Sequence, residues 1–157
     1  MNPYAPTEAK LTDLDPLEEK VNDAADGLAD ALRDIQARLN AKQLSVEAYA
    51  RTPLSYCTQP TSDANGRVVV MELLGYSRVP KCGHWALTVK TVRVVERFDT
   101  DDSDEILERV TSLLNSSREL QVAAVDVIPE LLGALVEAAN EIISKSSKAN
   151  ALALSLE

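Results

Sequence analysis

Aromatic residues, cysteine and histidine are all scarce in this chain. Of its 157 residues, 4% are aromatic, two are cysteine and one is histidine. With so few aromatic residues the core must be built from Leu, Val, Ile and Ala, as is usual where helices pack on a sheet. Two cysteines are too few for the disulfide scaffold of a small secreted protein.

Long apolar runs are missing as well. No run approaches the roughly 20 residues that cross a bilayer, and no export signal is visible near the N-terminus. We therefore expect a cytoplasmic protein that does not enter a membrane.

The scarcity of cysteine and histidine also limits the chemistry that is available. A zinc site or a cysteine nucleophile would have to be assembled from Cys57, Cys82 and His84. Zinc needs three or four converging ligands, and no fourth is evident. A Cys–His pair needs an orienting group and an oxyanion site, for which the sequence provides no candidates. The five glycines are scattered, so no phosphate-binding loop is formed. We predict no catalytic residue, no metal site and no cofactor.

Charge is abundant but unevenly distributed. The net charge is -9, yet residues 49–98 are basic and lie between two acidic flanks. The five basic residues that fall on predicted strands form a weak candidate anion-binding surface: Arg67, Arg78, Lys90, Arg93 and Arg97. Overall acidity repels nucleic acid, and the aromatic residues typical of single-strand binders are missing. We therefore favour pairing of this basic surface with the acidic helices, within one chain or across a dimer.

Two stretches have the periodicity of helices. The first begins at Asp15-Pro16, a capping residue followed by a proline suited to the first turn, and runs to about residue 43. Its apolar residues recur every three or four positions and so share one face. The second runs from Ser116 to about Lys145 and carries two apolar stripes. Pro129 is expected to kink or break it.

Three strands are predicted between these helices, at residues 54–58, 67–78 and 84–97. The second begins with a continuous apolar run, which favours a central position. In the third, the apolar alternation changes phase after Val89, which predicts a β-bulge near Lys90 and Thr91.

The remaining segments are connections and ends. Residues 99–105 are predicted to form an acidic loop, and 105–114 either a short helix or an irregular connector. Residues 1–14 are expected to form a flexible arm and 148–157 an apolar tail, which leaves 15–147 as a single domain.

The predicted fold class is therefore α+β. A three-stranded antiparallel sheet is flanked by a long N-terminal helix and a kinked C-terminal helical region.

The apolar helical faces are wider than so small a sheet can cover. We therefore expect a non-catalytic protein-interaction protein, a homodimer, that acts as an accessory or partner-binding factor of the chaperone or immunity type. Six helical residues are the candidates for binding the partner: Leu28, Leu32, Leu131, Leu135, Ile142 and Ile143.

Two other functions remain open. One is a small enzyme or ligand-binding module with a site near Cys57, Cys82, His84 and Trp85. The other, disfavoured by the overall charge, is a nucleic-acid accessory factor that uses the basic sheet surface.

Overall fold

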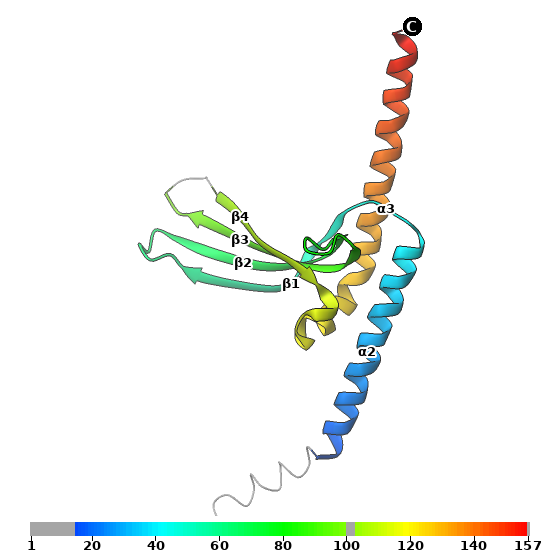
Figure 1. The fold of residues 1–157 in the computed structure, drawn as a ribbon. Coiled ribbons are helices and arrows are strands. Elements are labelled where there is room, and N and C mark those ends of the chain that lie inside the picture. The colour runs from blue at the N-terminus through cyan, green and yellow to red at the C-terminus, as the bar shows by residue number, and fades with distance from the viewer. Residues whose placement is uncertain (1–14, 100–102, 157) are drawn as a thin grey trace, which may run out of the picture.

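The computed structural model describes residues 15–99 and 103–156. The order of elements along these residues is α2 (Asp15–Ala41), β1 (Ala48–Pro60), β2 (Gly66–Arg78), β3 (Trp85–Arg97), β4 (Ser103–Ser112), the 3-10 turn η1 (Leu113–Asn115) and α3 (Arg118–Ser155). The strands form one antiparallel sheet in chain order (Figure 1). The α+β class, the antiparallel sheet and the two long helices are thus confirmed.

The prediction of three strands is wrong, because the described residues form four. Residues 103–112, expected to be a loop followed by a short helix or an irregular connector, pair with β3 as β4. The spacing of Ile106, Val110 and Leu113 suits a helix, but a ten-residue pattern is weak evidence. The outer edge of β3 needs partners for its backbone groups, and a strand supplies them where an isolated short helix cannot.

Strand β1 is longer than expected and has Pro53 in its interior. A proline is tolerated there because β1 is an edge strand, with one side free of ladder hydrogen bonds. The pairing of β1 with β2 shifts between Tyr49 and Pro53, where four steps along β1 match two along β2. The backbone of β1 between these residues is therefore released from the ladder.

Helix α3 continues through Pro129 without interruption, so the predicted break does not occur. The missing N–H of Pro129 deprives the Val125 carbonyl of its helical partner. Val125 is exposed, so water can donate to that carbonyl instead. The helix also continues to Ser155 and includes most of the segment predicted as a tail.

The bulge predicted within β3 is misplaced. Strand β3 pairs with β2 in unbroken register from Trp85 to Arg97. The irregularity lies in the pairing with β4, at Thr91 and Val92, and the extra residue belongs to β4. The phase change has another cause: Val89 is buried on the helix-facing side of the sheet, and Val92 is buried on the opposite side.

The helices cover only one end of the sheet (Figure 1). There, Leu74 and Leu87 from the inner strands pack with Leu32 of α2 and with Leu131 and Leu135 of α3. The rest of the sheet projects away from the helices. We call this projecting part the wing; it comprises residues 53–60, 66–72, 91–97 and 103–109.

Both helices extend beyond the body of the molecule, at opposite ends (Figure 1). Residues 16–24 of α2 and residues 140–155 of α3 are exposed throughout. We call these segments the α2 overhang and the α3 overhang. The two helices run in the same direction, so one overhang is N-terminal and the other C-terminal.

Candidate functional sites

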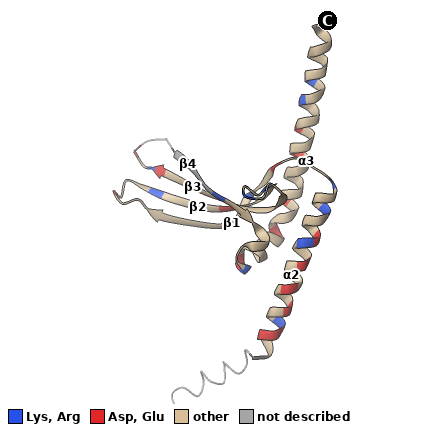
Figure 2. Ribbon diagram, in the orientation of Figure 1, with Lys and Arg blue, Asp and Glu red and all other residues tan. Residues whose placement is uncertain are grey.

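The five basic sheet residues do not form one surface. Because side chains alternate along a strand, the register places Arg78, Arg93 and Arg97 on the helix-facing side and Arg67 and Lys90 on the other. Figure 2 shows the blue segments spread along the strands without a common centre.

Most of these basic side chains also have partners within the sheet. Arg67 pairs with Glu96, and Arg97 lies 3.8 Å from Asp63 in the β1–β2 hairpin. The Arg78 guanidinium lies over the Trp85 ring, and the Lys90 ammonium over the Tyr49 ring. Pairing within the chain is thus present, but these partners come from the sheet and not from the acidic helices.

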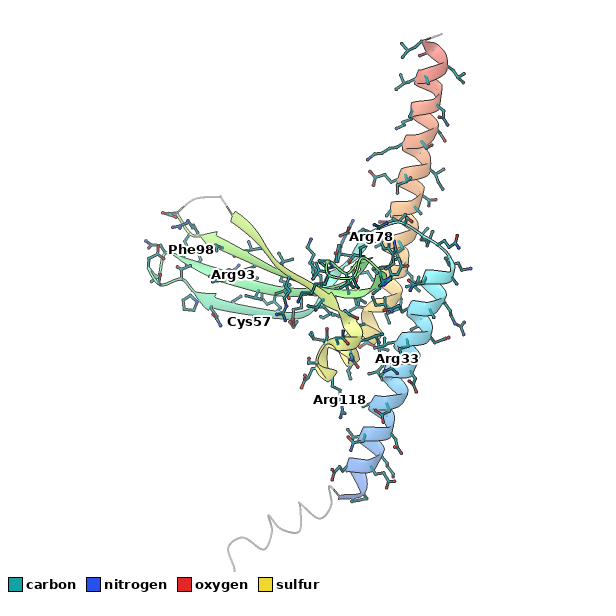
Figure 3. The ribbon with its side chains drawn as sticks, in the orientation of Figure 1. Arg33, Cys57, Arg78, Arg93, Phe98 and Arg118 are labelled. Carbon is teal, nitrogen blue, oxygen red and sulfur yellow. The ribbon has the colours of Figure 1, made fainter. Side chains whose placement is uncertain are left out.

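Cys57 lies far from Cys82 and His84. Cys57 is level with Val70 and Arg93 on the wing, whereas Cys82 and His84 follow the end of β2 at Arg78. Eight residues of strand separate these levels, about 26 Å at 3.3 Å per residue. Figure 3 shows Cys57 and Arg78 well apart along the sheet. Within the described part of the chain, no three His, Cys, Asp or Glu residues are grouped to hold a metal ion.

The turn after β2 brings Cys82 and His84 to the mouth of a cavity of about 630 Å³. The Val79 amide donates to the His84 carbonyl over 2.9 Å, and the Gly83 amide donates to the Val79 carbonyl over 2.8 Å. Gly83 has a φ of +68°, a left-handed conformation that favours glycine. The tight turn therefore depends on Gly83.

Aromatic rings form one wall of this cavity. Tyr76 and Trp85 stack with centroids 5.4 Å apart and planes inclined by 22°. Tyr76 is almost fully buried, and burial raises the pKa of its phenol. Its hydroxyl donates to the Asn40 side-chain oxygen over 2.7 Å. Cys82, His84 and Trp85 thus line one concavity, and Cys57 is not among its lining residues.

Residues of α2 supply the wall that sequence reasoning missed. The Gln36 side-chain oxygen accepts the Leu87 amide over 3.1 Å, and the oxygen of Asn40 is held by Tyr76. Each amide therefore has its acceptor engaged, and no other described residue accepts from its NH₂ donors. The signal was two amides, four residues apart, on a helix whose charged residues are mostly acidic.

The six predicted partner-binding residues fall into two groups. Leu32, Leu131 and Leu135 are buried in the core of the chain, and Leu28 packs partly against it. Ile142 and Ile143 are exposed in the α3 overhang. Only this second group lies where another molecule could contact it without unfolding the subunit.

A further apolar stripe runs along α3, beside its buried face. Its members are three or four positions apart except for two seven-residue steps, one across Pro129 and one across Ala139, and they are 41–63% exposed. We call this the outer stripe: Val122, Val125, Leu132, Val136 and Ile143.

No protein-family profile, curated protein or solved structure matches this chain. Among the described residues, neither long helix has an apolar stretch sufficient to cross a membrane.

Proposed function

We propose that this chain is a non-catalytic protein-interaction protein that works as a homodimer and serves as an accessory, partner-binding factor of the chaperone or immunity type. The observation that carries the proposal is the outer stripe, a row of large apolar side chains that the subunit leaves exposed. Contiguous exposed apolar surface is characteristic of interaction sites.

Packing of helix against helix is the simplest cover for such a stripe. Apolar positions spaced alternately by three and four residues form the seam by which helices pair. A second copy offers the same seam, and a two-fold contact buries both seams at once. The wing would remain open in this dimer, and its exposed Tyr56, together with the exposed Phe98 directly after β3, is a suitable contact for a further protein.

Analytical ultracentrifugation of the full chain tests the proposal. We expect a species of twice the chain mass of 17.1 kDa at micromolar concentration. Val136→Glu should weaken the dimer because it places a charge on the outer stripe. Ser144→Glu is the matched control, since this residue lies about a third of a turn away from the stripe on the same helix. A chain that sediments only as a monomer overturns the proposal.

A ligand-binding module is the second candidate, and the cavity beside Trp85 favours it. Leftover NH₂ donors of Gln36 and Asn40 at an aromatic wall suit a small planar ligand that carries a carboxylate or carbonyl acceptor.

Trp85 is the only tryptophan, so its emission reports on this cavity. Under the second candidate, benzoate should change the emission in a saturable way, and Asn40→Ala should raise the half-saturating concentration. A change that is linear in benzoate and identical in Asn40→Ala contradicts this candidate.

A further inference from the structure

The two overhangs each carry an apolar stripe that continues the packed face of their own helix. In the α2 overhang, Leu17, Val21 and Ala24 extend the face that leads to the buried Leu32. In α3, the buried positions Leu131 and Leu135 are followed through Ala138 by exposed residues on the same face of the helix. Those residues are Ile142, Ala149 and Leu152, with Leu156 directly after the helix.

The side chains of these stripes are exposed, whereas the same helix faces are covered by other parts of the subunit nearer the body. Leu17 and Val21 are about half exposed, and Leu152 is exposed by 65%. At 1.5 Å per residue the α2 overhang is about 14 Å long and the α3 overhang about 24 Å. Isolated helices this short are marginal in water unless an apolar face is packed. Each overhang therefore needs a helix beside it.

The overhangs also differ in the sign of their charge (Figure 2). The α2 overhang holds Glu18, Glu19 and Asp23 against a single Lys20. The α3 overhang holds Glu141, Lys145 and Lys148, and Lys145 pairs with Glu141 one turn earlier on the same helix. Its lysines thus outnumber its carboxylates by one. Lys145 lies within the α3 stripe itself, at the three–four spacing between Ile142 and Ala149. Two α3 overhangs placed together would bring their lysines together, and two α2 overhangs would bring their carboxylates together.

We propose that the α2 overhang of each subunit packs antiparallel against the α3 overhang of a second copy. This inference rests on the proposed homodimer and specifies which surfaces form it. A two-fold axis perpendicular to the helices inverts one copy relative to the other. Because the overhangs lie at opposite ends of the molecule, this inversion brings the α3 overhang of one copy to the same end as the α2 overhang of its partner. Each α3 overhang then lies beside the partner's α2 overhang, and both contacts form together.

Two-fold symmetry closes the assembly at two chains. In a head-to-tail arrangement, a pair of copies would keep one α2 overhang and one α3 overhang uncovered. Further copies would add at these overhangs, and the assembly would grow into an open filament. The antiparallel arrangement covers all four overhangs and pairs acidic with basic segments at both ends.

Site-directed cross-linking tests the arrangement. In a Cys57→Ser, Cys82→Ser background, Val21→Cys and Leu152→Cys are introduced singly and together, and a short bismaleimide is added. We expect covalent dimer from the doubly substituted chain and from a mixture of the two single variants. Neither single variant alone should give covalent dimer in high yield.

Charge reversal supplies an independent readout. Lys145→Glu with Lys148→Glu should raise the dimer dissociation constant about tenfold at low salt, and by less in high salt. Adding Glu18→Lys and Glu19→Lys to the same chain should return the dissociation constant toward that of the unsubstituted dimer. Lys42→Glu is the control, because this exposed lysine follows the opposite end of α2 from the overhang.

The outcomes separate this inference from the proposed function. A chain that remains monomeric overturns both. A chain that dimerises but cross-links Leu152→Cys to itself, or Val21→Cys to itself, overturns the antiparallel arrangement and leaves the homodimer standing. A dimer whose dissociation constant is unaffected by the charge reversals also contradicts the arrangement.

Discussion

The Glu130 carboxylate of α3 accepts the backbone N–H of Arg51 in β1 over 2.6 Å, across 79 residues of sequence. It also accepts the N–H of Thr52 over 3.0 Å. These amides lie in the irregular part of β1, where the ladder to β2 is interrupted. One side chain thus satisfies two released donors and joins the helix to the edge of the sheet.

This contact predicts a dependence of stability on pH. The Thr52 hydroxyl, followed by the backbone amides of Thr52 and Arg51, holds the pKa of Glu130 below its ordinary value. A depressed pKa in the folded state means that the carboxylate stabilises fully above the unfolded value of about 4.3. That contribution is lost as the pH falls through the folded pKa.

Glu130→Gln removes this titration. The urea midpoint of the variant should therefore fall less between pH 6 and pH 3 than that of the unsubstituted chain, and at pH 7 it should be lower. Glu137→Gln, on the same helix and exposed, is the matched control and should follow the unsubstituted chain. Parallel curves for all three proteins would refute the role given to Glu130.

Neighbouring leucines of α3 should respond very differently to truncation. Leu131 is completely buried, and Leu132 is 41% exposed. Leu131→Ala leaves a cavity and should lower the free energy of unfolding by about 2–5 kcal/mol. Leu132→Ala should change it by about 0.5 kcal/mol or less. Urea unfolding at low protein concentration measures both, and equal losses would contradict the placement of α3.

Gly75 should not tolerate a side chain. A Cβ at this position would overlap the ring of Tyr49, which lies across it on the adjacent strand. Gly75→Ala should destabilise the fold by about 1–3 kcal/mol, because the ring must move. Gly27→Ala, on a helix with open space around it, should instead stabilise by about 0.5–1 kcal/mol. Thermal unfolding followed by circular dichroism compares the two, and a neutral Gly75→Ala would show that the ring moves freely.

Ser77 and Thr88 form a buried hydroxyl pair, with their oxygens 2.9 Å apart. Thr88→Val leaves the Ser77 hydroxyl without that partner and should cost about 1–3 kcal/mol. Adding Ser77→Ala should recover part of the loss, since the Ser77 hydroxyl is then no longer buried without its Thr88 partner. Chemical denaturation of the double-mutant cycle measures the coupling, and strictly additive losses would argue against the pair.

Local signals in the sequence were enough for several elements. The cap at Asp15 and the regular apolar spacing identified α2 within a few residues of its end at Ala41. Strands β2 and β3 are bounded by turn residues and were placed within one residue of their observed limits. Strand β4 was missed because its apolar spacing also fits a helix, and the demand of the β3 edge for a partner is a tertiary effect.

Which side of each element is buried was harder to predict. The phase change in β3 was interpreted as a bulge, but it reflects helices that cover only half of one sheet face. Leu131 and Ile142 belong to the same stripe of α3, yet one is buried and the other exposed. The difference depends on where the body of the molecule ends, which a periodic pattern does not encode. The cavity beside Trp85 depends on the docking of α2, and for the same reason only its sheet residues were anticipated.

The two prolines of β1 have a consequence for how the sheet meets other chains. Pro53 lies inside this border strand and Pro60 ends it, and neither can donate a backbone hydrogen bond. An incoming strand would therefore find missing donors along this border, which hinders the runaway stacking seen in amyloid. At high concentration, prolines in an edge strand therefore lower the tendency of a chain to form fibres through that edge.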